Sequence, residues 1–190
     1  MKKIILMMLI LLSVSANAQK DVTKFLGIPV DGYKTEMKKK LIDKGFTYDA
    51  QNDRFEGEFN GQNVYVYIVT NNNKVWRIAV SDANFVGETD IKIRFNKLCN
   101  QFEKNDKYIK ASLKEYRLSE DEDISYEIIV NNKRYEACYY QKSNPETKMP
   151  IEWELMKKKF VWFMINEFYG MYNIAMFYDN EYNHSDGEDL

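Results

Sequence analysis

The sequence predicts an α+β protein in which helices pack on one face of antiparallel sheet, and three observations support this prediction. Arg54 to Val80 alternates apolar and polar residues around an Asn-Gly pair and an Asn-rich turn, which is the strongest short-range signal for β-hairpins. Between residues 91 and 102, apolar side chains recur at helical spacing. Two runs near the end, Phe160 to Ile165 and Tyr172 to Tyr178, are apolar on both faces, as expected for central strands.

The first eighteen residues have the pattern of a secretory signal peptide. Lys2 and Lys3 form the charged region, residues 4–12 form the apolar stretch, and Ala16-Asn17-Ala18 offers a small-residue cleavage site. The apolar stretch is too short to span a membrane as a helix. We therefore expect cleavage after Ala18 and a periplasmic or secreted protein with no integral membrane segment after cleavage.

The composition predicts a packed domain without affinity for nucleic acid. The formal net charge is −2, and lysine clusters at residues 38–40 and 157–159 are expected to be solubilising surfaces. Aromatic residues make up 15% of the chain, with few Pro and Gly, which favours a sheet-rich core and argues against disorder.

The strands around Asn60-Gly61 are expected to build the core with one face. A two-residue turn pairs Phe59 with Gln62 and Phe55 with Val66, so their apolar side chains share a face. The next turn leaves two alternatives. A two-residue turn at Asn71-Asn72 places Trp76 beside Tyr67, whereas a three-residue turn over residues 71–73 adds Trp76, Ile78 and Val80 to the apolar face. We prefer the three-residue turn, because it gives one uniformly apolar face.

The opposite face of these strands combines charge with aromatic residues. An ordinary solvated face is one interpretation, and a recognition surface is the other, since Tyr and Arg are enriched where partners dock. The candidate partner-binding residues are Tyr65, Tyr67 and Arg77, with Glu56 and Glu58 at the margin. Gly57, on the core face, is expected to leave room for a helix.

Two helices are expected. The first follows a cap at Asp31-Gly32, runs over Tyr33 to Lys44 and ends at Gly45, with Met37, Leu41 and Ile42 as its apolar stripe. The second is capped by Thr89 and runs to about Asn105, with the stripe Ile91, Phe95, Leu98 and Phe102 as core.

The second half is expected to supply about four more strands. Residues 124–130 and 133–141 are predicted to form a hairpin across Asn131-Asn132, and residues 158–167 and 171–178 form another around Gly170. The acidic loop at residues 119–123 lacks the spacing of a calcium hand, so no metal site is predicted. An exported compartment permits a disulfide between Cys99 and Cys138, and two unpaired buried thiols are the alternative.

The order of these elements repeats and resembles a known fold. FLGIPVDG, GEFNGQ and NNNKVWRI also look like segments of small exported proteins of Bacteroides-type bacteria. The order of helix and then strands, given twice, resembles the tandem repeats of the beta-lactamase-inhibitor-protein-like (BLIP-like) fold, whose helices pack on one side of an antiparallel sheet. The predicted units are the signal peptide at 1–18, a first repeat at 19–85, a second at 86–178, and an acidic mobile tail at 179–190.

The resemblance implies that the exposed sheet face binds another protein. Sequence motifs point to no reaction: the chain has one His, and it has no P-loop, dinucleotide fingerprint or zinc-protease motif. The leading hypothesis is therefore a noncatalytic exported interaction module without a cofactor, which docks an envelope or extracellular protein. The alternative is a carrier that holds a small apolar ligand among Phe160, Trp162, Tyr172 and Tyr178.

Overall fold

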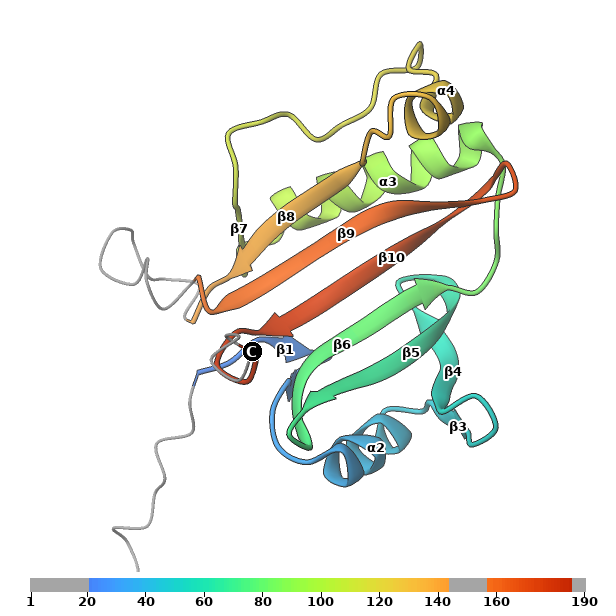
Figure 1. Cartoon of the computed structure of the whole chain (residues 1–190). Coiled ribbons are helices and arrows are strands. Elements are labelled where there is room, and N and C mark those ends of the chain that lie inside the picture. The colour runs from blue at the N-terminus through green and yellow to red at the C-terminus, as the bar shows by residue number, and fades with distance from the viewer. Residues whose placement is uncertain (1–20, 144–156, 186–190) are drawn as a thin grey trace, which may run out of the picture.

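One antiparallel sheet runs through both halves of the chain (Figure 1). The structure is a computed structural model that describes residues 21–143 and 157–185. Within these residues the eight-stranded sheet has the order β3-β4-β5-β6-β10-β9-β8-β7, and β1 and β2 form a separate ribbon. The elements are β1 (Lys24–Phe25), β2 (Ile28–Pro29), α2 (Lys34–Asp43), β3 (Thr47–Asp49), β4 (Arg54–Phe59), β5 (Gln62–Asn71), β6 (Lys74–Asp82), α3 (Glu88–Glu103), β7 (Tyr108–Lys110), α4 (Ile124–Ile129), β8 (Glu136–Gln141), β9 (Lys159–Phe168) and β10 (Met171–Asn180).

The two halves join where β6 pairs with β10. In each half a long helix is followed by four strands that pair in sequence order, α2 before β3 to β6 and α3 before β7 to β10. The last strands of the halves pair antiparallel, with Arg77 opposite Asp179 and Val80 opposite Met176. On both sides of this seam, the first strand of the half lies at the outer edge of the sheet and the last strand lies at the seam. The apolar runs of β9 and β10 occupy inner positions, as predicted.

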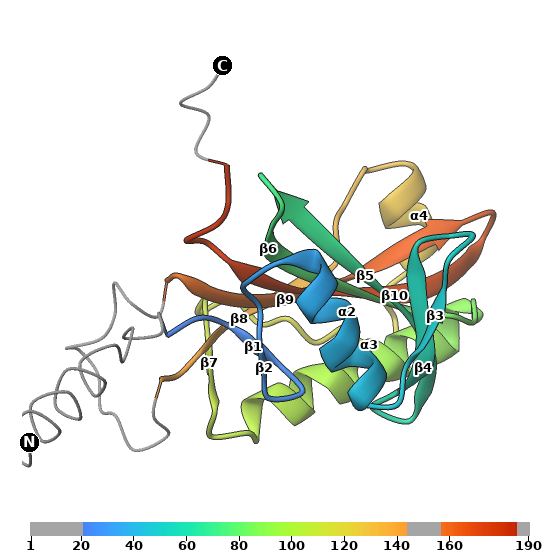
Figure 2. The ribbon, with the colours of Figure 1, turned by 90° about the horizontal axis from the view of Figure 1, so that it is seen from below.

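Both long helices pack on the same face of the sheet, which we call the helix face. Val80, Met176 and Phe163 lie side by side across β6, β10 and β9, and the Phe163 ring is 5.2 Å from that of Phe95 in α3. The predicted stripe of α3 is buried, and α2 buries Met37 and Leu41 in the same core. Figure 2 shows α3 along the lower side of β8, β9 and β10. The opposite face, which no helix crosses in Figure 1, is called the open face.

The helix ends differ in detail from the prediction. The residues that precede the helices are Tyr33 and Gly87, and neither makes a side-chain capping bond, so Asp31 and Thr89 are not caps. Ile42, expected in the apolar stripe of α2, is 52% exposed.

The first hairpin forms in the predicted register. Phe59 lies opposite Gln62 and Phe55 opposite Val66, and Asn60 and Gly61 have φ values of 51° and 72°. Gly57 makes close packing possible, but its neighbour is a ring and not a helix. A Cβ at this position would lie 2.6 Å from Cδ1 of Phe46, the residue that leads out of α2.

The second hairpin corrects the preferred register. Its turn is the two-residue pair Asn72-Asn73, closed by Asn71 opposite Lys74, and a bulge follows because Thr70 pairs with Val75 while Val69 pairs with Arg77. A two-residue turn with positive φ at both residues fits the twist of the strands, and the bulge then restores the register that buries Ile78 and Val80. The extra residue is Trp76, which leaves the core, while Val75 is fully buried.

The predicted strand at residues 124–130 is a helix. Asp123 accepts a hydrogen bond from the backbone N–H of Tyr126 at 2.9 Å and thereby caps α4. The apolar residues of this segment do not build a sheet face, because Ile124 is buried while Tyr126, Ile129 and Val130 are more than half exposed. The predicted partner strand forms as β8 and pairs with β7 and β9.

The acidic tail begins later than predicted. β10 extends to Asn180, and both Asp179 and Asn180 are buried. Asn183 donates from its side-chain amide to Asp31 Oδ1 at 2.7 Å and to the Val75 carbonyl at 2.9 Å. Residues 179–185 are therefore part of the fold. The predicted signal peptide, residues 144–156 and residues 186–190 lie outside the described residues.

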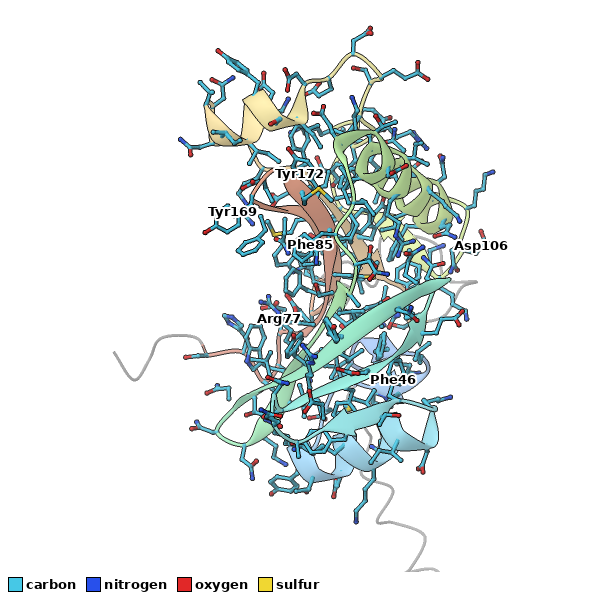
Figure 3. All side chains as sticks on the ribbon, turned by 90° about the vertical axis from the view of Figure 1, so that its right-hand side faces the viewer. Phe46, Arg77, Phe85, Asp106, Tyr169 and Tyr172 are labelled. Carbon is cyan, nitrogen blue, oxygen red and sulfur yellow. The ribbon has the colours of Figure 1, made fainter. Side chains whose placement is uncertain are left out.

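The β9–β10 turn holds an unfavourable residue. Tyr169 has a φ of 51° although it is neither Gly, Asn nor Asp, and its side chain is 89% exposed (Figure 3). Gly170 supplies the second positive φ, and its N–H donates to Glu167 Oε1 at 2.7 Å. Left-handed backbone is disfavoured for a bulky residue, whereas Asn tolerates it.

We predict that Tyr169→Asn stabilises the protein. The substitution gives the turn the Asn-Gly pair that this geometry favours, at the loss of one ring contact to Phe168. Relief of backbone strain should raise the free energy of unfolding by about 0.5–1 kcal/mol. Urea titration measures this difference, and Tyr169→Ser serves as the control because it removes the ring without supplying a favoured turn residue. Equal stabilities of the two variants would contradict the prediction.

Candidate functional site

The open face is continuous across five strands. One row of directly paired residues crosses it: Tyr67 on β5, Ala79 on β6, Phe177 on β10, Trp162 on β9 and Cys138 on β8. Successive side chains of a strand point to opposite faces of the sheet. This row therefore points to the open face, while the adjacent row with Val80, Met176 and Phe163 points to the core. The face is thus built by the same pairing that builds the core.

A salt bridge lies at the centre of the open face. The Arg77 guanidinium donates from Nε to Asp179 Oδ1 at 2.6 Å and from Nη2 to Asp179 Oδ2 at 2.7 Å. Trp162 Nε1 donates to the same Oδ2 at 3.0 Å. The Asp179 side chain is only 4% exposed and that of Arg77 is 22% exposed. With three donors on one carboxylate, the pair is structurally satisfied and holds β6, β10 and β9 in register.

Aromatic rings surround this salt bridge. The guanidinium carbon of Arg77 lies 4.3 Å from the ring centre of Trp76 and 4.8 Å from that of Phe177. Phe177 in turn stacks on Trp162, with ring centres 4.2 Å apart. The ring of His184 meets that of Trp76 edge to face at 4.6 Å, so the last described segment rests beside the cluster. We call Arg77, Asp179, Trp162, Phe177 and Trp76 the central cluster.

The other predicted partner-binding residues lie on one side of the central cluster. Tyr67 is 36% exposed, and Tyr65 is half-buried beneath the guanidinium of Arg54, whose carbon is 3.7 Å from the ring centre. Arg54 also pairs with Glu56 at 2.8 Å. Glu56 and Glu58 are exposed on β4, next to these tyrosines. The five predicted residues share the open face, but Arg77 is engaged internally and is not a free cation.

Apolar side chains gather at the far end of the open face. Phe168 and Met171 close the β9–β10 hairpin and are 61% and 43% exposed. Phe85, in the connection between β6 and α3, lies 5.8 Å from Phe168 between ring centres and is also exposed. With Tyr169 they form what we call the apolar tip. Figures 1 and 3 show α4, which carries further exposed apolar residues, next to this hairpin turn.

The sequence reasoning did not identify the apolar tip or the role of Trp76. Two features of the sequence could have predicted the apolar tip. The even-numbered residues of β9 continue the open face to Phe168, and Tyr-Gly is an unusual pair for a hairpin turn. The position of Trp76 depends on a bulge, for which the Asn-rich turn gave no unique register.

The two cysteines are free thiols on opposite sides of the sheet. Cys99 is buried in α3 and interacts with the Tyr139 side chain on the helix face. Cys138 precedes Tyr139 in β8 and therefore points to the open face. Burial raises the pKa of each thiol to about 11.

The aromatic residues proposed to enclose an apolar ligand divide between the two faces. Phe160 and Trp162 lie on the open face, whereas Tyr172 and Tyr178 are buried on the helix face. They do not line one cavity, because the sheet separates the two pairs.

The described residues hold no group of three or more His, Cys, Asp or Glu side chains arranged to bind a metal ion. Among the helices of that part of the chain, none is long and apolar enough to cross a membrane. Comparisons of the chain with protein-family models, with curated proteins and with solved structures found no match.

The buried position of Asp179 generates a stability prediction. Asp179→Asn keeps the shape but leaves the Arg77 charge without its partner, so the free energy of unfolding should fall by about 2–3 kcal/mol. The matched control is Glu56→Gln, which removes a carboxylate from an exposed ion pair on the same face and should change stability by less than about 0.5 kcal/mol. Urea titration of both variants tests this, and equal effects would contradict it.

The thiols generate a second prediction. Because burial raises the pKa of both, neither Cys99 nor Cys138 should react with iodoacetamide at neutral pH in the folded protein. Both should react after unfolding in urea without reductant. Intact-mass measurement reads out the number of added groups. A disulfide would instead block both additions and lower the mass by two hydrogens.

Proposed function

We propose that this chain is an exported, noncatalytic interaction module whose open face docks a folded protein partner. The observation that carries the proposal is an uncovered sheet face with partly exposed Trp, Tyr and Arg side chains, the residue types that dominate binding energy at protein interfaces. Export rests on the signal-peptide pattern of residues 1–18.

The chemistry of the open face favours a protein over a charged polymer. Its central salt bridge is internally neutralised, and Arg54 is paired with Glu56 nearby. Exposed aromatic and apolar surface lies at Tyr67 on one side and at the apolar tip on the other, with the exposed Glu56 and Glu58 at the margin. An aromatic centre that carries few unpaired charges is typical of the core of a protein interface.

The proposal includes the resemblance to tandem BLIP-like repeats, and it rests on the arrangement of the halves. Each half places one long helix before four antiparallel strands, and both helices leave the same face of the sheet open. In the BLIP-like fold such a face binds protein. A shared arrangement does not fix the partner, so inhibition of a lactamase is not part of the proposal.

The proposal is tested by position-specific photo-crosslinking in envelope extract. A photoreactive residue at Tyr67 should yield a discrete crosslinked partner, whereas one at Ile42 on α2 should not, although both side chains are exposed and apolar. The partner is then purified and titrated against variants by calorimetry. Tyr65→Ser with Tyr67→Ser should weaken binding about tenfold or more. The control, Ile42→Ser with Ile93→Ser on the helices, should leave the affinity unchanged.

Tyr169→Asn separates binding from folding in the same assay. The variant is expected to be at least as stable as the parent, so weaker binding could not come from unfolding. Crosslinks of equal yield from Tyr67 and Ile42, or equal effects of the two double variants, would overturn docking on the open face.

A further inference from the structure

A groove lies on the helix face, on the other side of the sheet from the proposed docking surface. It consists of two adjoining cavities of about 470 and 540 Å³ that share five lining residues. The shared residues are Leu26, Phe59, Asn105, Tyr108 and Tyr178. Each cavity has the size of a small-molecule site. The groove runs between the β1–β2 ribbon and the C-terminal end of α3, where the two halves of the fold meet.

The interior of the groove is apolar and fixed. Tyr178 and Met176 of β10 form its floor and are almost fully buried, and Phe102 of α3 forms a wall. Tyr178 packs on Phe25 with ring centres 5.0 Å apart, and Phe25 packs on Phe59 at 5.2 Å. These rings belong to the core, so the groove is preformed.

The two ends of the groove differ in polarity. At one end Asn60 and Gln101 exchange side-chain hydrogen bonds of 2.9 and 3.2 Å, which join the β4–β5 turn to α3. At the other end the lining includes Lys24, Lys107 and Lys142. Within residues 21–143 and 157–185, none of these three ammonium groups forms an ion pair, while Asp21, which lines the same end, is paired with Lys159 at 2.6 Å.

The lysine end is also held in place by hydrogen bonds. Gln141 accepts from the Lys24 backbone N–H at 2.7 Å and donates to the Lys24 carbonyl at 3.1 Å. The Lys142 N–H donates to the Lys107 carbonyl at 2.8 Å. These backbone contacts place Lys24, Lys107 and Lys142 around the mouth of the groove, without an ion pair to any of the described residues. The arrangement is complementary to a molecule with an anionic head and an apolar body.

Leu26 adds an independent observation. It sits in the β1–β2 turn with a φ of 51°, lines both cavities and is 40% exposed. Among the described residues, the other non-glycine residues with positive φ are Asn or Asp, except Tyr169. The chain thus keeps a leucine at a position where Asn would be less strained, and its side chain covers the groove.

We propose that this groove binds an amphipathic anion of the fatty-acid class, with its carboxylate among Lys24, Lys107 and Lys142 and its chain along Tyr178 and Met176. The site lies on the helix face and not on the open face, and it shares only Tyr178 with the four aromatic residues first considered for an apolar ligand. The mode of binding is a charge-assisted contact at the mouth combined with burial of apolar surface inside.

Three probes that share one tail test the proposal by calorimetry below their micelle concentrations: dodecanoate, dodecanol and dodecyltrimethylammonium. Dodecanoate should bind saturably at one molecule per chain. Dodecanol should bind about tenfold more weakly, because it lacks the charge that the lysines recognise, and the cation should bind more weakly still. Equal affinities for the three probes, or binding that does not saturate, would overturn the proposal.

Charge-matched variants locate the head group. Lys24→Gln with Lys107→Gln and Lys142→Gln should weaken dodecanoate binding about tenfold while leaving dodecanol binding unchanged. The control replaces Lys39, Lys97 and Lys114 by Gln, which lowers the net charge equally at exposed sites outside the groove. Equal loss in both triple variants would show an effect of net charge alone and would refute the site.

Leu26→Asn locates the tail. It should weaken binding of dodecanoate and of dodecanol alike, and urea titration should show stability equal to or above that of the parent protein. Unchanged affinity for both probes would exclude Leu26 and the groove that it covers.

Discussion

The pairing of β6 with β10 is the contact on which the rest of the structure depends. It joins two meanders that would otherwise each end in a free strand edge, and it sets the register of every residue on both faces. On the helix face it brings Val80 beside Met176 in the core. On the open face it brings Arg77 beside Asp179, and Trp162 from the next strand completes the salt bridge. A slip by one residue would exchange these two faces, so the buried carboxylate also makes the register specific.

The first and last segments that the structure describes close one side of this seam. Thr23 donates from its hydroxyl to the carbonyl of Asp179, and Asn180 donates from its amide to the carbonyl of Val30 at 2.7 Å. Nearby, Lys159 is 1% exposed at the side chain and is held by Asp21 and by Ser143 Oγ at 2.8 Å. Buried polar groups of this kind must find partners, and here the partners come from segments far apart in sequence. The N-terminal segment is therefore an integral part of the sheet's support.

Local signals predicted the parts of the fold that local interactions determine. Asn60-Gly61 specifies its turn alone, and the α3 stripe specifies a buried helix, because turn geometry and helical period are properties of short segments. The errors arose where distant contacts decide. Residues 124–129 have strand-favouring side chains, yet the distant contacts that bury Ile124 and join its N–H to Glu88 Oε1 at 3.1 Å, together with the local cap from Asp123, make them helical. Arg77 was predicted to face a partner, but its ligand is Asp179, 102 positions later. The open face as a surface was predictable from alternation, whereas its charges could be paired only in three dimensions.

The four tight hairpin turns of the described chain fall into two pairs, which differ in whether the residue with positive φ tolerates that backbone geometry. Two of them use Asn60-Gly61 and Asn72-Asn73, which adopt positive φ at little cost. The other two place Leu26 and Tyr169 in the same backbone geometry, at a strain of about 1 kcal/mol or more each. Burial of apolar surface does not offset this strain, because both side chains remain substantially exposed. Leu26 lies over the groove on the helix face, and Tyr169 stands at the end of the open face, so strain occurs once at each surface for which binding is proposed. Replacing either residue by Asn should therefore make the protein more stable and its surface less able to bind, a combination that simple damage to the fold cannot produce.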